Sequence, residues 1–462
     1  MNSLKTYQII LLFLLLSVTV IIFTPILNAE YAKTDDWVML KSYSGTLKNI
    51  SLNYIINTFK NSHEGLYHPL VTLSYSLEVM IFGFVPAIFH FDNILLHLLN
   101  IVLVFLLFFK LSKNNYWISF IITVLFAIHP TRVEVVSWIS ARKDLLYAPF
   151  YLLSILFYLK YNERTTKIPD CHADKSACND GQWQIYTSIH LYLYTSIFFF
   201  LLSCFSKSMA ITLPFLLILI DWYTNNLNRK KFKIYLPYFI IAIVFIFIAI
   251  KVHYPTNYIN SNFSLFNHFI NFINAHFNIL FYFDKLFLPI NLYCMYPYFY
   301  KMTTMPPWFI MYSPAVLYIL IFFSFLSLKK YKIKTIFFGI FFFLITILPT
   351  SGMLKTGDFM VADRYTYLPY LGLFFIIAKF IIFIFRKYNR IVKSFIICIC
   401  ISVFLIFGYL SSERIFDWII DAYGPPVIME YYEFGLIKSK ARYIRKYKIR
   451  KFLDNLTSLY KF

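Results

Sequence analysis

Two adjacent aspartates, Asp35 and Asp36, stand directly after the first long apolar run of the 462-residue chain and directly before Trp37. Adjacent carboxylates repel each other, which raises the pKa of one of them and suits it to take a proton from a hydroxyl group. An ordinary acidic loop or a helix N-cap would use the same residues, and on spacing alone that alternative is the more common outcome. The pair is therefore one candidate for a general base.

A second polar stretch, HPTRVEVVSWISARKDLL, runs from His129 to Leu146. Its candidate substrate-binding residues are His129, Arg132, Glu134, Arg142 and Asp144. The stretch is too polar for lipid contact, and the residues between its charges are too apolar for a solvated loop. Its basic side chains could face an anionic head group, while its carboxylates could hold a substrate hydroxyl group or position a basic side chain. An interfacial helix with snorkelling charges is an equally good interpretation.

Two further stretches add cations. FSKSMAITLP places Lys207 in the turn of a tight helical hairpin, where it could pair with a lipid phosphate or simply extend to the interface. SGMLKTGDFMVADRYTYLP, which ends at Pro369, contributes Asp363, Arg364 and Tyr365. Because Arg forms two parallel hydrogen bonds with phosphate, Arg364 is a natural phosphate or pyrophosphate clamp.

Taken together, the four stretches combine paired acids with several cations. A polyprenyl-phosphate sugar needs this combination, because its lipid tail stays between helices while its phosphate departs as an anion. Cations neutralise the departing phosphate, and a carboxylate deprotonates the acceptor hydroxyl group. The residue types therefore favour transfer of a sugar from a lipid carrier.

The chain that positions these residues is 60% hydrophobic and only 14% charged, which is too little charge for the surface of a soluble domain. The basic residues behind its net charge of +21 are spread over short loops between apolar runs. That distribution is typical of membrane orientation and not of a face that binds nucleic acid. We therefore expect an all-α, polytopic integral membrane protein with membrane lipid, and no nucleic acid, as a partner.

The apolar runs predict about 11 transmembrane helices, each near the length that crosses a bilayer. They lie at 9–27, 88–109, 116–128, 145–159, 188–205, 209–223, 235–250, 309–328, 335–349, 366–385 and 394–410. The first is expected to be an uncleaved anchor. With Lys5 in the cytoplasm, the basic clusters alternate so that all four polar stretches face outward. Residues 251–308 are expected to lie at the outer surface or to re-enter the membrane.

Metal-binding motifs are weak. Cys171 and Cys178 share a polar loop with His172, but their spacing fits no compact zinc pattern, so a solvated loop is expected. Asp and Glu residues are available elsewhere, yet no compact ligand motif indicates Mg²⁺ or Mn²⁺. No cofactor is assigned, and a requirement for a divalent metal is left open.

Six stretches, in order along the chain, resemble the bacterial relatives of the transmembrane and tetratricopeptide-repeat O-mannosyltransferases. These proteins are type-C glycosyltransferases related to the protein O-mannosyltransferases. The stretches are Asp35–Asp36, YHPLVTLSYSLE, FGFVPAIFHFDNILLHLLN, HPTRVEVVSWISARKDLL, SKSMAITLPFLLILIDWY and ADRYTYLPYLG. Each is weak alone, but six in order, spread over residues 35–372, are a strong resemblance.

The resemblance implies an active site outside the cytoplasm, in the bacterial inner membrane, and a polyprenyl-phosphate-linked hexose donor such as mannose. The acceptor would be a protein or glycan hydroxyl group. The acidic pair of the first loop would supply the base, and here we prefer Asp36 to Asp35. The stretch YHPLVTLSYSLE adds His68 to the predicted substrate-binding residues.

Residues 1–410 are expected to form the transferase domain, and 411–462 a short outer tail. The tail has no clear tetratricopeptide signature, although Arg414 and Trp418 weakly resemble the stretch that leads into such repeats. Two other functions stay open. A transporter or flippase of lipid-linked glycan would use the same cations without a base, and an inactive membrane scaffold would tolerate substitution of the acidic pair.

Overall fold

The computed structural model describes residues 5–32, 36, 40, 50–62, 65–165, 180–253, 265–294, 296–297, 307–331, 334–352 and 359–423. Asp35, the loop that carries Cys171 and Cys178, and the predicted tail after Tyr423 lie outside these residues. The predicted domain boundary at residue 410 falls within a helix that continues to Tyr423. The division into domains therefore stays a prediction.

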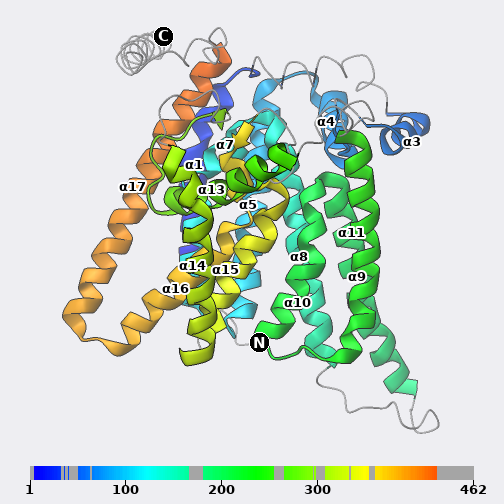
Figure 1. Ribbon diagram of the computed structural model, residues 1–462. Coiled ribbons are helices and arrows are strands. Elements are labelled where there is room, and N and C mark those ends of the chain that lie inside the picture. Colours follow the sequence, from blue (N-terminus) through cyan, green and yellow to red (C-terminus); the bar gives the residue numbers. More distant parts are fainter. Residues whose placement is uncertain are drawn as a thin grey trace. The chain divides into compact units, whose positions relative to one another are not determined.

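The described part of the chain is almost entirely helical (Figure 1). Its first half contains α1 (Thr6–Phe23), η1 (Thr24–Asn28), α3 (Leu52–Lys60), α4 (Pro69–Phe82), α5 (Pro86–Leu111), α6 (Tyr116–Ile128), α7 (Arg132–Ser137), η2 (Ile139–Ala141), α8 (Arg142–Thr165), α9 (Asp180–Ser206), η3 (Ser208–Thr212) and α10 (Leu213–Tyr223). Its second half contains η4 (Arg229–Lys231), α11 (Phe232–His253), α13 (Leu265–Phe287), β1 (Tyr296–Pro297), α14 (Pro307–Tyr331), α15 (Lys334–Ile347), η6 (Leu348–Thr350), β2 (Phe359–Val361), η7 (Asp363–Thr366), α16 (Tyr370–Lys387) and α17 (Arg390–Tyr423).

Local sequence signals explain where several helices begin and end. Proline opens α4 and α5, where a missing backbone N–H does no harm. α5 ends at a sharp turn in which Lys113 and Asn114 have positive φ angles of 57° and 62°. The side chain of Asn115 then caps α6, because its Oδ1 accepts a hydrogen bond of 3.1 Å from the backbone N–H of Ile118.

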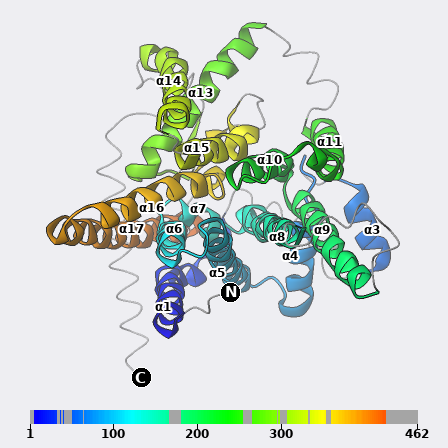
Figure 2. The same cartoon turned by 90° about the horizontal axis from the view of Figure 1, so that it is seen from below.

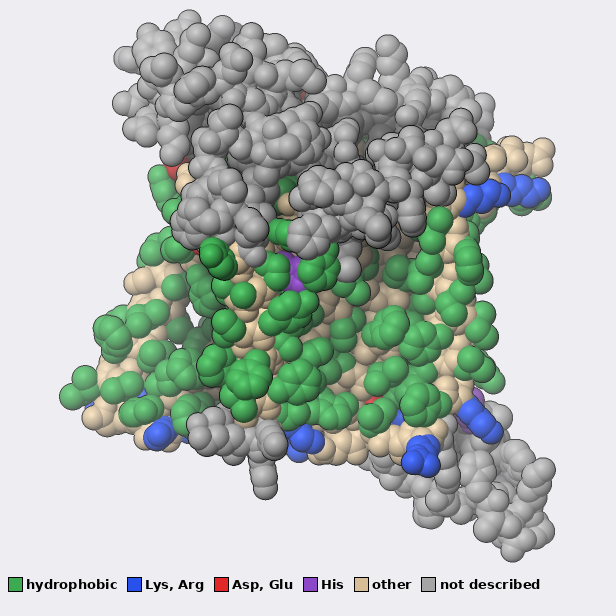
Figure 3. Space-filling view, in the orientation of Figure 1, with side chains coloured by type: hydrophobic (Ala, Val, Ile, Leu, Met, Phe, Trp, Pro, Cys, Tyr) green, Lys and Arg blue, Asp and Glu red, His purple; other side chains and the backbone are tan. Residues whose placement is uncertain are grey.

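The protein is an all-α membrane protein. Within the part of the chain that the structure describes, five helical segments are long and apolar enough to cross a bilayer: Thr6–Asn28, Pro86–Leu111, Ile189–Ser206, Phe232–Val252 and Arg390–Ile419. Five shorter apolar helices accompany them, so the predicted count of 11 is not confirmed. On the face seen in Figure 3, hydrophobic side chains cover the middle of the molecule. Lys and Arg side chains lie along its lower edge, and another group lies at the upper right.

Viewed along the helices, α8, α9 and α10 lie together on one side, and α16 and α17 lie on the other (Figure 2). α15 and α16 approach each other closely at two glycines. A β-carbon added to Gly372 would lie 2.4 Å from the carbonyl oxygen of Gly339, and the reciprocal distance is also 2.4 Å. Small residues permit such backbone contact between membrane helices. The start of α16, which follows η7, is thereby packed directly against α15.

The ambiguous region 251–308 contains α13 and the short strand β1. β1 pairs with β2 in an antiparallel arrangement, with Tyr296 opposite Val361. This pairing fixes the chain immediately before η7. The hydroxyl group of Tyr282 on α13 also accepts a hydrogen bond of 3.1 Å from the backbone N–H of Ala362. α13, β1 and β2 therefore support the loop that carries Asp363 and Arg364.

Candidate active site

The polar stretches predicted from the sequence meet at one end of the helices, the end where α7 lies in Figure 1. α7 packs against η7 and against the C-terminal half of α17. The start of α8 and the turn before η3 contribute the neighbouring side chains. Three ion pairs, described below, join these elements, and a fourth joins α8 to α4. We call this the site end of the protein.

Asp36 is buried, with an exposed fraction of 1%. Its Oδ1 accepts a hydrogen bond of 2.8 Å from the backbone N–H of Ser140 and another from the Ser140 hydroxyl group. Its Oδ2 accepts one of 3.2 Å from the backbone N–H of Ala32. These hydrogen bonds fix the orientation of the Asp36 carboxylate. The structure thus links the first polar stretch to the second.

Arg142, at the start of α8, forms a buried ion pair with Glu78 of α4. Its Nε donates a hydrogen bond of 3.0 Å to the side-chain oxygen of Asn93, and one terminal nitrogen donates one of 2.8 Å to the carbonyl oxygen of Phe89. Its guanidinium also lies 4.6 Å from the centre of the Tyr75 ring. Arg142 is therefore occupied by protein partners, which indicates that it braces α4, α5 and α8 against one another.

Lys207 and Arg364 lie close together, and each is held by a carboxylate. Lys207 pairs with Asp144, and Arg364 pairs with Glu134. Both oxygens of Glu134 are used, since the second accepts a hydrogen bond of 2.9 Å from the backbone N–H of Arg364. The Tyr365 ring is shared by both cations, at 5.4 Å from Lys207 and 5.0 Å from Arg364. Two cations that were predicted to bind phosphate therefore contact the same predicted aromatic residue.

Two buried polar atoms beside these cations lack hydrogen-bond partners. Among the described residues, Asp144 Oδ2 and Arg364 Nε are buried and have no hydrogen-bond partner. Burial lowers the pKa of Lys207, and the carboxylate of Asp144 opposes that shift. A buried donor or acceptor that lacks a partner is unfavourable unless a ligand or water meets it. The geometry therefore leaves one donor and one acceptor available to a bound molecule.

Asp363, the residue before Arg364, pairs with Arg414 of α17. Its carboxylate also accepts hydrogen bonds of 3.1 and 3.3 Å from the hydroxyl group of Tyr296. Burial raises the pKa of Asp363 to about 6, while the charge of Arg414 lowers it and that of Glu134 raises it. Asp363 therefore acts as an anchor between α17 and η7 when it is ionised.

Arg132 differs from the other cations because its guanidinium has no hydrogen-bond partner within the described ranges. It is fully buried, and the rings of Phe126, Tyr367, Tyr370 and Phe374 lie 5.2 to 5.9 Å from it. Burial lowers its pKa to about 10. Cation–π contacts thus take the place of hydrogen bonds around this guanidinium.

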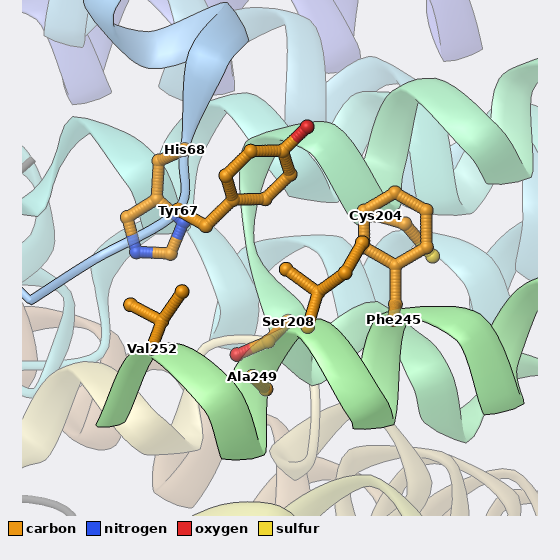
Figure 4. Close-up of a pocket in the computed structure, with 8 residues that line it drawn as sticks. Tyr67, His68, Cys204, Ser208, Phe245, Ala249 and Val252 are labelled. Atoms are coloured by element: carbon orange, nitrogen blue, oxygen red, sulfur yellow. The ribbon is translucent and has the colours of Figure 1, made fainter. Parts of the chain in front are cut away.

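The two predicted histidines differ in their surroundings. His129 is fully buried, with its ring nitrogens 2.9 Å from the Thr131 hydroxyl group and 3.2 Å from the carbonyl oxygen of Leu286. His68 instead lines a small pocket together with Tyr67, Cys204, Ser208, Phe245, Ile248, Ala249 and Val252. Figure 4 shows the His68 ring above Val252, with Tyr67 beside it. The bonds of His129 indicate a structural role, whereas His68 lines a pocket that also includes Ser208, the residue after Lys207.

Several residues of the site end were not singled out by the sequence. Glu78 and Asn93 lie inside quoted stretches but were not predicted as partners of Arg142. Trp138, whose ring lies 4.9 Å from Arg364, was not predicted either. Arg414 and Trp418 were noted only as the start of the tail. Charges inside apolar runs were the available signal, because such charges need a partner.

Metal binding has no support from the described part of the chain. Nowhere in it do three or more His, Cys, Asp or Glu side chains gather closely enough to hold a metal ion. The four cysteines that it contains, Cys204, Cys294, Cys398 and Cys400, are not in disulfide bonds. The loop with Cys171 and Cys178 lies outside the described residues.

Three animal proteins are similar in sequence to this chain. Protein O-mannosyl-transferase TMTC2 of Mus musculus is 39% identical over 108 residues, which is 22% of this chain and 12% of that protein. Protein O-mannosyl-transferase TMTC1 of Homo sapiens is 33% identical over 99 residues, 21% of this chain and 11% of that protein. Protein O-mannosyl-transferase F38B6.6 of Caenorhabditis elegans is 25% identical over 333 residues, 68% of this chain and 41% of that protein.

The matches support the predicted relation at the level of the O-mannosyltransferase family. No family model matches the chain. The chain spans less than half the length of each of these three relatives. The prediction of bacterial relatives has no support from these matches, since all three are animal proteins.

Proposed function

We propose that the protein is a membrane glycosyltransferase that moves a hexose, specifically mannose, from a polyprenyl-phosphate donor to a hydroxyl group of a protein or glycan. The observation that carries this proposal is the convergence of Lys207 and Arg364 on the Tyr365 ring. Arg364 Nε would donate to a phosphate oxygen of the donor, and Asp144 Oδ2 would accept from a sugar hydroxyl group. The names of the similar proteins point to the same chemistry.

Asp36 would take the proton of the acceptor hydroxyl group. That hydroxyl oxygen would then attack the anomeric carbon as the bond from this carbon to the phosphate oxygen breaks. Polyprenyl phosphate leaves with one more negative charge than it carried in the donor, and Lys207 and Arg364 would neutralise it. A single attack inverts the configuration at the anomeric carbon, and one base suffices without a covalent intermediate.

The proposal places the site end on the outer face of the membrane, because basic loops mark the cytoplasmic side of membrane proteins. Lys and Arg side chains line the lower edge of the view in Figure 3, the edge away from α7 in Figure 1, while a further group lies at the upper right. An impermeant cysteine reagent tests the orientation on intact cells. Labelling of cysteines introduced at the exposed positions 61 and 233 from the same side would rule the orientation out.

The test of function is a transfer assay with the purified full-length protein in lipid nanodiscs. The probe is polyprenyl-phosphate mannose with a radioactive sugar, offered with a mixture of envelope proteins and glycans. Transfer of label that Asp36→Asn abolishes, and that the distant surface variant Glu163→Gln retains, supports the proposal. Movement of the lipid across a vesicle membrane without transfer would identify a transporter instead. The absence of both transfer and movement would favour the inactive scaffold.

A further inference from the structure

α17 touches the site end through a chain of stacked contacts. Its Trp418 stacks on Trp138, with ring centres 5.9 Å apart and an angle of 26° between the ring planes. The Trp138 ring lies 4.9 Å from the guanidinium of Arg364. Arg364 then contacts Tyr365 at 5.0 Å, and Tyr365 contacts Lys207 at 5.4 Å. Aromatic rings thus connect α17 to Arg364 and Lys207, the two cations proposed to bind the donor phosphate.

A second, independent contact starts one helical turn earlier on α17. Arg414 pairs with Asp363, the residue bonded directly to Arg364 in the chain. Another nitrogen of Arg414 donates a hydrogen bond of 2.9 Å to the carbonyl oxygen of Pro130, just before α7. Trp418 therefore reaches the Arg364 side chain through Trp138, whereas Arg414 reaches the Arg364 backbone through Asp363.

We propose that Arg414 and Trp418 are positioning residues that hold Arg364 in the orientation that binds the donor phosphate. This inference rests on the proposed function and adds a role for α17 to it. An arginine side chain loses rotamer freedom when it is fixed. Contacts that fix it before the donor arrives reduce that loss at the moment of binding. The helix that leads toward the C-terminus therefore governs the affinity for the lipid phosphate.

The experiment uses polyprenyl monophosphate, the product that would leave the reaction, as the binding probe. Its dissociation constant is measured by competition on the full-length protein in nanodiscs. Trp418→Leu removes the ring that stacks on Trp138, and we expect about tenfold weaker binding, within the range of a buried aromatic pair. Trp418→Phe keeps a smaller ring against Trp138, and we expect about threefold weaker binding. The matched control is Tyr409→Leu, which removes a 63% exposed ring from the same helix and should leave binding unchanged.

A double substitution separates positioning from general damage to the fold. If Trp418 acts through Arg364, adding Trp418→Leu to Arg364→Gln weakens binding no further. The acceptor KM should also stay at the wild-type value in Trp418→Leu, while the donor KM rises. Equal loss of affinity in the wild-type and Arg364→Gln backgrounds would overturn the inference, and so would unchanged affinity in Trp418→Leu.

Arg414 gives a variant pair that does not depend on the tryptophan stack. Arg414→Lys keeps the charge opposite Asp363 and should bind polyprenyl monophosphate within about threefold of wild type, whereas Arg414→Gln should lose about tenfold. Equal binding by Arg414→Gln and wild type would remove Arg414 from the inference. Wild-type protein that binds no polyprenyl monophosphate would refute the proposed function, and the inference would fall with it. Wild-type binding that the α17 substitutions leave untouched would refute the inference alone.

Discussion

The two ends of α8 carry buried polar clusters of different kinds. At the site end, Asp144 pairs with Lys207 but keeps one oxygen without a partner among the described residues. About 25 Å away along the helix, Tyr158 and Asn162 donate hydrogen bonds to Asp221 of α10, which accepts another from Tyr235 of α11.

We call Asp221 and its partners the distal cluster. Lys231 completes it, because its amino group lies 2.9 Å from Asp221 and donates a hydrogen bond of 3.0 Å to the side-chain oxygen of Asn162. Within the described residues, none of the buried side-chain atoms of this cluster lacks a partner. A closed network is suited to holding helices together, whereas an open one can still bind a ligand. The comparison teaches that burial of charge alone does not identify an active site; unsatisfied groups are the better indicator.

The largest expected effect is on stability, at the distal cluster. Asp221→Asn leaves Lys231 buried without its counter-charge, so the free energy of unfolding should fall by about 3 kcal/mol or more. Tyr235→Phe removes only one hydrogen bond and should cost about 1 kcal/mol. Unfolding in SDS measures both values, and sugar transfer per folded molecule should stay within about twofold of wild type. A collapse of transfer with unchanged stability would mean that the distal cluster takes part in the reaction.

The next effect is on turnover, at the site end. Asp36→Asn keeps the size of the side chain and removes its basicity, so kcat should fall by about 100-fold or more. Binding of polyprenyl monophosphate should be largely retained, and Asp35→Asn should act less severely. The transfer assay with radioactive donor measures kcat for each variant. Activity in the double variant would exclude a carboxylate base from the acidic pair.

A smaller effect is expected from Arg364→Lys, which keeps the charge but loses the planar fork. Donor affinity should fall by about 1–3 kcal/mol. Lys60→Arg is a suitable control, because it lies on α3 and makes the reverse exchange. Donor binding by Arg364→Ala at the wild-type level would remove Arg364 from the site.

The smallest effect is the response to pH. The pKa of Asp363 is raised from its ordinary value to about 6, chiefly by burial. Below pH 6 the carboxyl group gains a proton and its ion pair with Arg414 is lost, whereas above pH 6 the pair is complete. Donor affinity should therefore weaken by about threefold between pH 7 and pH 5. Other groups whose charges act on Asp363 or respond to it are Glu134, Arg132, Tyr282, Tyr296 and Tyr370.

The same pH series reports on stability with the opposite sign. Because the folded protein holds the Asp363 proton more tightly than the unfolded chain does, this group favours the folded state most below about pH 4. That contribution is lost as the pH rises through about 6. Asp363→Asn should flatten both responses, and an unchanged pH dependence in this variant would assign them to another group.

Much of the helix pattern could be predicted from the sequence, because apolar runs and turn residues are local signals. The predicted helix at 116–128 coincides with α6, and 88–109 lies inside α5. The partner of each charged residue was harder to predict from the sequence. Arg142 was predicted as a substrate-binding residue that could face an anionic head group. Its ion-pair partner Glu78 lies 64 positions earlier in the chain and reaches Arg142 only through the packing of α4 against α8. Which carboxylate meets which cation is a tertiary property that residue spacing does not contain.

The distal cluster shows the same limit. Asp221 sits within the run LLILIDWY, and its composition indicates only a helix that ends near an interface. Its three hydrogen-bond donors come from two other helices, so no local pattern announces them. Most of the charges in the predicted stretches nevertheless gather at the site end.

The contact between Gly339 and Gly372 makes two apolar positions sensitive to mutation. Exchange of either glycine hydrogen for a methyl group would place a carbon atom 2.4 Å from a carbonyl oxygen of the facing helix. The two backbones would then have to separate by about 1 Å, roughly the gap to ordinary van der Waals contact. Since Gly372 follows Arg364 by only eight residues, an alanine there would displace the cation site without altering a single polar atom. A screen for loss-of-function variants should therefore find hits in the hydrophobic interior, at residues that carry no functional group at all.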